Sequence, residues 1–230
     1  MPEYRNELGL PTGFPVEDWM PCAHPPHESM TGDYCYVVPL DPELHAADIH
    51  QANILDKENR MWVYLAYGPF ESEKDYRNWI DETCLEDDPQ FYAIVDKNTG
   101  IAAGVASYLR IDPKNGAIEV GHINFAPPLQ HSTAATEAMY LMMKRIFDEL
   151  GYRRYEWKCD ALNARSCRAA ERLGFTYEGT FRQAMVYNGR NRDTAWYAIT
   201  DREWPSIRAT FQKWLDPDNF DETGKQRNKL

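Results

Sequence analysis

Residues 116–151, GAIEVGHINFAPPLQHSTAATEAMYLMMKRIFDELG, decide the fold. They start as an alternating strand, which must end before Pro127 and Pro128 because proline has no N–H to give to a sheet. From about Ser132, apolar residues recur every three or four positions until Gly151 ends the pattern. The stretch therefore predicts a strand, a short loop and a long amphipathic helix.

Two polar residues of this strand are Glu119 and His122. Side chains alternate between the two faces of a regular strand. We therefore expect Glu119 and His122 on opposite faces, where they cannot act as a close pair.

The first turn of the predicted helix is a candidate anion site. Free backbone N–H groups and the positive end of the helix dipole favour a phosphate at a helix N-terminus. Every side chain after His131 is small enough for a pyrophosphate to approach. The turn consists of Gln130, His131, Ser132, Thr133, Ala134 and Ala135.

The rest of the chain predicts an α+β domain. Strands are expected at 34–40, 91–96, 101–111, 118–126, 155–159, 175–185 and 193–200, and helices at 41–53, 72–85, 132–150, 163–173 and 201–214. We expect an extended arm at 1–31, rich in proline and glycine, one folded domain at 32–214, and a polar, disordered tail from 215 to 230.

Composition sets limits on location and partners. The formal net charge of −11 argues against nucleic-acid binding. No apolar run is long enough to span a membrane, and no secretory leader is visible, so no membrane partner is expected. The five cysteines are odd in number and contain no C-x-x-C pair, which favours a reduced, cytoplasmic protein. The histidines have no pattern of metal ligands, and no metal is expected.

Three separate motifs carry a resemblance to a known family. Gln130-x-x-Thr133-x-Ala135 resembles the signature with which GCN5-related N-acetyltransferases (GNAT) hold the pyrophosphate of acetyl-coenzyme A. Asn163-x-x-Ser166 followed by a helix ending in Leu-Gly-Phe at 173–175 resembles a second block of that family. With the closing Glu-Trp-Pro at 203–205, the likeness is strongest to the branch of ribosomal-protein N-terminal acetyltransferases (RimJ/RimL type).

The resemblance implies a GNAT fold and the placement of acetyl-CoA. The fold would have a mixed sheet of about seven strands, largely antiparallel, with acyl-CoA in a cleft where the central strands splay. Ser166 would lie beside the sulfur and donate a hydrogen bond to the thiolate. Thr133 replaces the family's usual glycine, and Ala170 stands where many members carry a tyrosine that protonates the thiolate. The remaining cofactor contacts implied are Ile123, Phe125, Asn163 and the turn 130–135.

Direct transfer of an acetyl group to an amine needs a base and no covalent enzyme intermediate. The resemblance implies that Glu119 is the base. The alternative is that Glu119 has no catalytic role and lies on a solvent-facing or salt-bridged face of the strand. His122 is the second candidate, because imidazole titrates near neutral pH, and its alternative is a packed, hydrogen-bonded residue. We expect aromatic residues of 61–70 to form a wall of the acceptor pocket; the alternative is that they pack in the core. These residues are Trp62, Tyr64, Tyr67 and Phe70.

The acceptor itself stays open. It is expected to be a primary amine, either a protein N-terminus or a small molecule, and the nine acids against two bases in 71–96 favour a cationic one. Ala170 motivates a different reading, a non-catalytic CoA-binding sensor, and a third reading is transfer of a larger acyl group such as succinyl. The resemblance also leaves a homodimer open.

Overall fold

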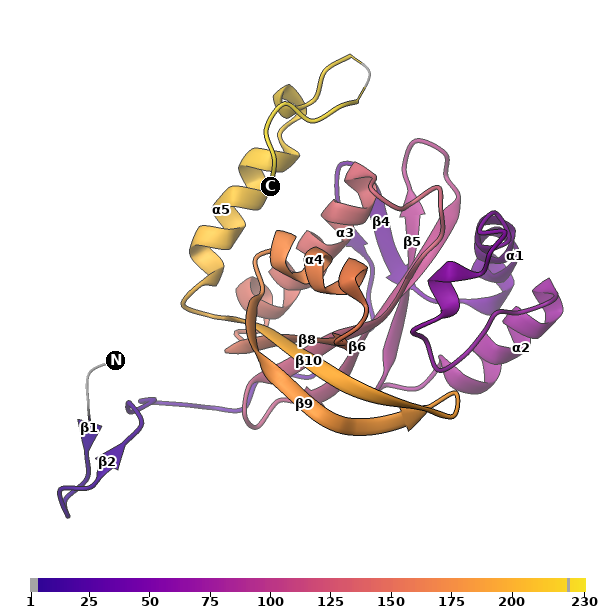
Figure 1. The fold of residues 1–230 in the computed structure, drawn as a ribbon. Helices are drawn as coiled ribbons and strands as arrows, with labels where there is room; N and C mark the ends of the chain where they lie inside the picture. Colours follow the sequence, from indigo (N-terminus) through magenta and orange to yellow (C-terminus); the bar gives the residue numbers. More distant parts are fainter. Residues whose placement is uncertain (1–3, 223) are drawn as a thin grey trace.

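The computed structural model of the protein describes residues 4–222 and 224–230 (Figure 1). The strands are β1 (Tyr4–Arg5), β2 (Pro11–Thr12), β3 (Met30–Thr31), β4 (Cys35–Pro39), β5 (Gln90–Asp96), β6 (Ala102–Asp112), β7 (Ala117–Phe125), β8 (Arg154–Asp160), β9 (Thr176–Tyr187) and β10 (Arg190–Thr200). The helices are α1 (Pro42–Asn53), α2 (Glu73–Thr83), α3 (Thr133–Lys144), α4 (Ala164–Arg172) and α5 (Trp204–Leu215), with the short turns η1 (Arg60–Trp62), η2 (Arg145–Glu149) and η3 (Pro217–Asn219).

One large sheet organises the domain. Its eight strands run in the order β3-β4-β5-β6-β7-β8-β10-β9, and β7 with β8 is its parallel pair, while the other neighbours are antiparallel. This confirms the predicted α+β class and the largely antiparallel, mixed sheet. The eighth strand is β3, which pairs with β4 at one edge and which the sequence pattern does not reveal.

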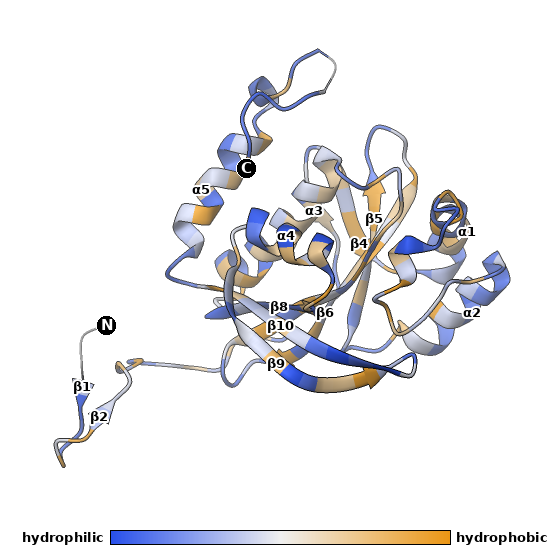
Figure 2. Cartoon of the chain, in the orientation of Figure 1, coloured by the Kyte–Doolittle hydropathy of each residue, from blue (hydrophilic) through white to orange (hydrophobic). Residues whose placement is uncertain are grey.

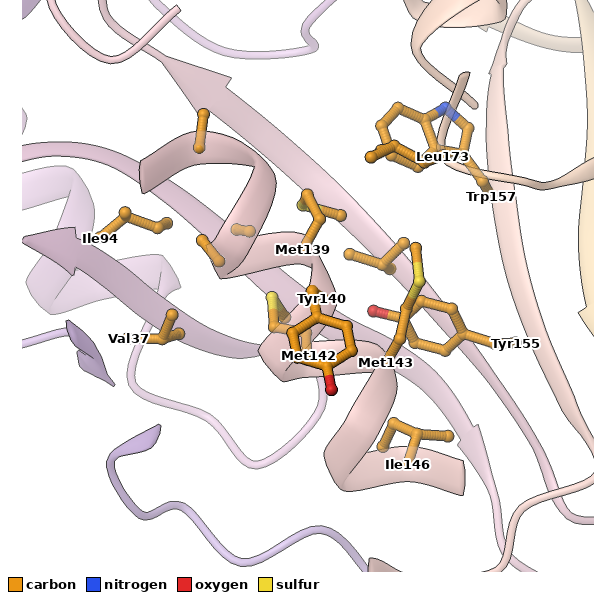
Figure 3. Close-up of a cluster of buried hydrophobic side chains, with 14 of the residues drawn as sticks. Val37, Ile94, Met139, Tyr140, Met142, Met143, Ile146, Tyr155, Trp157 and Leu173 are labelled. Carbon is orange, nitrogen blue, oxygen red and sulfur yellow. The ribbon is translucent and has the colours of Figure 1, made fainter. Parts of the chain in front are cut away.

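The sheet separates two hydrophobic cores. On one face, Met139, Met142 and Met143 of α3 lie among buried residues of the sheet such as Val37 and Tyr155 (Figure 3). The second core unites buried residues of α1, α2 and the β5–β6 pair, which are Ala46, Ile49, Tyr76, Ile80, Phe91, Ala93, Ala102 and Val105. Strands β4 and β5 accordingly carry mainly hydrophobic colours in Figure 2, since helices cover both of their faces.

The central helix begins where the sequence indicates. Ser132 is the N-cap of α3, and its Oγ accepts a hydrogen bond from the backbone N–H of Ala135 at 3.0 Å. The five-residue π-helical turn η2 extends α3, and Gly151 follows with a φ of +68°. The predicted strand, loop and helix are all present.

The two ends of the chain differ from each other. Met1–Glu3 of the predicted arm lie outside the described residues. The β1–β2 hairpin stands clear of the body (Figure 1). Further along the arm, the indole N–H of Trp19 donates to the carbonyl oxygen of Lys114 at 2.9 Å. The described residues of the tail fold back, contrary to the expected disorder. Asn219 is buried and donates to the carbonyl oxygen of Trp214 at 2.9 Å, and the indole of Trp214 donates to Gln226 at 2.9 Å.

Candidate active site

A β-bulge in β7 reshapes the centre of the sheet. Gly121 pairs with Ser107 and Asn124 pairs with Val105, so two residues of β7 oppose one residue of β6. His122, the first of the two, has a φ of +49°. The bulge interrupts the alternation on which the sequence expectation depended.

The bulge places Glu119 and His122 on the same face of the sheet, so the expected separation is wrong. Residues that pair directly across antiparallel strands point to the same face. Glu119 pairs with Leu109, two residues from Ser107 along β6, and the Ser107 side chain contacts the His122 ring. Leu109 and Ser107 share a face, and therefore so do Glu119 and His122.

A cleft opens where β7 and β8 separate. Their parallel pairing covers only 117–120 of β7 and 154–157 of β8, although both strands continue. The cleft has a volume of about 1300 Å³. Its walls come from the end of β7, the start of α3, α4, the loop at 60–64, and α5 with the tail.

The start of α3 forms one end of the cleft. The backbone N–H groups of His131, Thr133 and Ala134 have no hydrogen-bond partner within the described part of the chain. Gln130 turns back and donates to the carbonyl oxygen of Phe125 at 2.8 Å. The structure thus gathers the predicted turn around the cleft, except that the Ala134 side chain is buried in the core and does not line it.

The expected thiolate residues lie on α4. Asn163 is the N-cap of α4, and its Oδ1 accepts from the N–H of Ser166 at 3.2 Å. Ser166 Oγ accepts from the indole N–H of Trp157 at 2.9 Å, which leaves the hydroxyl hydrogen of Ser166 to donate. Both residues line the cleft with Ile123 and Phe125, whereas Ala170 is fully buried.

Charge in the cleft is of one sign. The basic residues of its lining are Arg60, Arg165, Arg168, Arg172 and Lys225, and the described lining includes no Asp or Glu. The acidic segment 71–96 therefore does not form a wall of the cleft. Arg165, Arg168 and Arg172 recur at spacings of three and four, a helical stripe that the sequence shows but that we did not single out.

Glu119 lies in an ion-pair network and not in the cleft. It is 3% exposed, and its Oε2 lies 2.8 Å from Lys158 Nζ and 2.5 Å from Arg110 Nη1. Lys158 continues the network to Glu156 at 2.6 Å. This arrangement corresponds to the salt-bridged alternative that the sequence left open for Glu119.

His122 is packed against aromatic rings and, like Glu119, is not among the described residues that line the cleft. Its ring stacks on Phe91 with centroids 4.9 Å apart, and its Nδ1 lies 2.8 Å from Ser107 Oγ. Ser107 can also donate its hydroxyl hydrogen to the carbonyl oxygen of Gly121, at 3.3 Å, and would then accept from Nδ1–H. That arrangement leaves Nε2 unprotonated. Burial, with a contribution from the charge of Arg110, lowers the pKa of His122 to about 4, so the ring is neutral at neutral pH.

The aromatic wall is mostly core. Trp62 is 6% exposed, and Tyr67 stacks on Trp79 with centroids 4.4 Å apart. Phe70 packs edge-to-face on Trp62. Of the four aromatic residues expected to contact the acceptor, only Tyr64 lines the cleft, and its hydroxyl donates to the carbonyl oxygen of Leu162 at 3.2 Å.

Sequence reasoning did not identify Asn124. This residue lines the cleft just beyond the bulge and is 4% exposed. No local sequence signal identifies Asn124, because the bulge that sets which face of the sheet its side chain occupies depends on pairing with β6. Among the described residues, no group of three or more His, Cys, Asp or Glu is arranged to hold a metal ion.

The unpartnered N–H groups at the start of α3 and the basic residues of the cleft suit a ligand that carries several negative charges. Residues 36–176 match the acetyltransferase (GNAT) domain. The chain therefore belongs to the GNAT family, and it is an N-acetyltransferase.

Individual relatives agree with this assignment. A GCN5-related N-acetyltransferase from Brucella melitensis shares 42% identity and a TM-score of 0.91, covering 93% of this chain and 97% of its own. The putative ribosomal N-acetyltransferase YdaF of Bacillus subtilis is 28% identical over 66% of this chain and 84% of its own length. The RimL ribosomal L7/L12 alpha-N-protein acetyltransferase in complex with coenzyme A shares the fold, with a TM-score of 0.63 at 24% identity, covering 75% of this chain and 98% of its own. The predicted resemblance to the RimJ/RimL-type branch is confirmed.

Proposed function

We propose that the protein transfers the acetyl group of acetyl-CoA to a primary amine by direct attack, with the cosubstrate bound in the β7–β8 cleft. The observation that carries this proposal is the cleft itself. Among the described residues, it joins N–H groups without a partner at the start of α3 to a lining that is basic and includes no Asp or Glu. Both features favour a ligand with several phosphate charges.

The residues of the cleft fit this cosubstrate. The N–H groups of His131, Thr133 and Ala134 would hold the pyrophosphate, and the basic residues of α4 and the tail would hold the remaining phosphate. The backbone of Ile123 and Phe125, which lies beyond the last β7 residue that pairs with β8, would bind the pantetheine amides. Ser166, whose Oγ already accepts from Trp157, would donate its hydroxyl hydrogen to the departing thiolate.

We assign the role of base to His122 and not to Glu119. Proton acceptance requires an unprotonated group with a free lone pair. His122 is neutral and its Nε2 has no hydrogen-bond partner among the described residues, whereas both Glu119 contacts are with cations. The pKa of about 4 makes His122 a weak base, so it would accept the proton only as the amine attacks.

The acceptor that suits the cleft is an amine whose remaining groups are neutral. The lining without acids offers nothing to a second ammonium group, which disfavours a polyamine. We therefore propose a peptide α-amine or a similar monoamine, in place of the polycation that the acidic segment suggested.

Location and assembly are part of the proposal. The described cysteines are all free thiols, which supports a cytoplasmic protein. No helix in the described residues is long and apolar enough to cross a membrane. The homodimer stays a prediction; the edge strand β9 exposes Tyr177, Phe181 and Val186, which a second subunit could cover.

The test combines binding with turnover. Acetyl-CoA binding is measured by calorimetry, and thiol release is then followed with glycinamide, a hexapeptide with a free N-terminus and spermidine as acceptors. Binding with release on glycinamide or the peptide supports the proposal. Binding without release on any amine would favour the sensor reading that Ala170 motivates. Release with spermidine alone would overturn the assignment of the acceptor.

A further inference from the structure

Asn124 is a buried polar residue with no partner. Its side chain lines the cleft and is 4% exposed, yet neither Oδ1 nor Nδ2 has a hydrogen-bond partner among the described residues. A buried amide without hydrogen bonds costs stability, and such groups in folded proteins are few. An unsatisfied amide at the wall of a cleft indicates that a bound molecule completes its hydrogen bonds.

The bulge fixes which side of the sheet Asn124 faces. Asn124 pairs with Val105 of β6, and Val105 lies on the same face of β6 as Ser107. The side chain of Ser107 contacts the ring of His122. Val105 belongs to the core beneath α1 and α2. Asn124 and His122 are therefore on the same face, opposite the core that contains α3.

We propose that Asn124 holds the acceptor amine, with Oδ1 accepting one N–H of the amine while His122 Nε2 accepts another. This inference rests on the proposed function and adds to it an acceptor-binding residue. A primary amine has enough N–H groups for both contacts, and a tertiary amine does not. This proposal limits the acceptor to amines that can donate to both residues at once.

The variant Asn124→Leu separates this role from a structural one. Leucine has nearly the same shape and leaves no buried polar atom, so a residue kept only for the fold would lose little or gain stability on this change. We expect an unchanged or higher melting temperature, acetyl-CoA affinity within about 2-fold of wild type, and kcat/KM for the amine lower by about 10-fold or more, which corresponds to the loss of one hydrogen bond. Asn124→Asp retains an oxygen acceptor and should keep more turnover than Asn124→Leu.

Asn53 supplies the matched control. It is also 4% exposed, both of its amide atoms are also without a partner among the described residues, and it does not line the cleft. Asn53→Leu should change the melting temperature in the same direction and leave the kinetics unchanged.

The assay uses the whole 230-residue chain, acetyl-CoA and the fastest acceptor among glycinamide, the hexapeptide and spermidine. Unchanged kcat/KM in Asn124→Leu, or a fall in melting temperature together with activity, would overturn the inference. So would equal kinetic losses in Asn53→Leu. Failure of the wild type to bind acetyl-CoA would instead contradict the proposed function, which the calorimetric titration detects separately.

Discussion

Replacing Glu119 by glutamine tests whether this residue stabilises the fold through ion pairs or acts as the catalytic base. Glu119→Gln keeps the shape of the side chain and removes its charge from Lys158 and Arg110. Removing one partner of a buried ion pair typically costs about 3–5 kcal/mol. Here Lys158 retains Glu156 at 2.6 Å and Arg110 is largely exposed, so we expect a smaller loss, about 2 kcal/mol in the free energy of unfolding.

Urea unfolding followed by fluorescence measures this loss. For a domain of this size, about 2 kcal/mol corresponds to a fall of roughly 4–8 °C in melting temperature. The thiol-release rate per folded molecule should stay within about 3-fold of wild type, because a general base contributes about 100-fold or more. Glu178→Gln is the control at the exposed end of the network, where Glu178 pairs with Arg154, and it should cost less than about 1 kcal/mol. Normal stability with a rate reduced 100-fold would refute the reasoning and return Glu119 to the role of base.

Three further outcomes follow from the site. The pKa of His122 is lowered to about 4 in the folded protein, so between pH 6.5 and about 4 the unfolded chain binds more protons than the folded chain, and stability should decrease as the pH is lowered through that window. His122→Gln should make this decrease smaller and reduce turnover by about 100-fold. An unchanged pH dependence of stability, or full activity, would contradict this. Ser166→Ala should lower turnover by about 10-fold with unchanged acetyl-CoA affinity, as the thiolate loses one donor; an equal rise in the dissociation constant would show a binding role instead. Lys225→Ala should reduce the preference for CoA over 3′-dephospho-CoA by about 3-fold in calorimetry, whereas Lys229→Ala, outside the cleft, should not; equal effects of both would mean that only net charge matters.

The sequence predicts the parts of the site that depend on local chemistry. Prolines 127 and 128 end the strand, Ser132 caps the helix, and the small residues of the first turn leave its N–H groups accessible. These features need only neighbouring residues. Residues of the two motifs at 130–135 and 163–166 therefore line one cleft in the structure.

Features that depend on tertiary pairing were not predictable. The bulge in β7 arises from its register with β6, and it reverses the expected face of His122 relative to Glu119. The ion pairs of Glu119 depend on Lys158, a residue of β8 that only the parallel pairing brings near. The folded tail depends on the burial of Asn219, which composition does not indicate.

The most direct measurement is a calorimetric titration of the wild-type protein with acetyl-CoA, followed in the same cell by addition of the hexapeptide and detection of free thiol. We predict binding whose affinity falls as salt rises, because the phosphates meet a basic cleft, and thiol release that requires the free N-terminal amine. An N-acetylated hexapeptide should release no thiol beyond background. Absence of binding, or equal release with both peptides, would contradict the account.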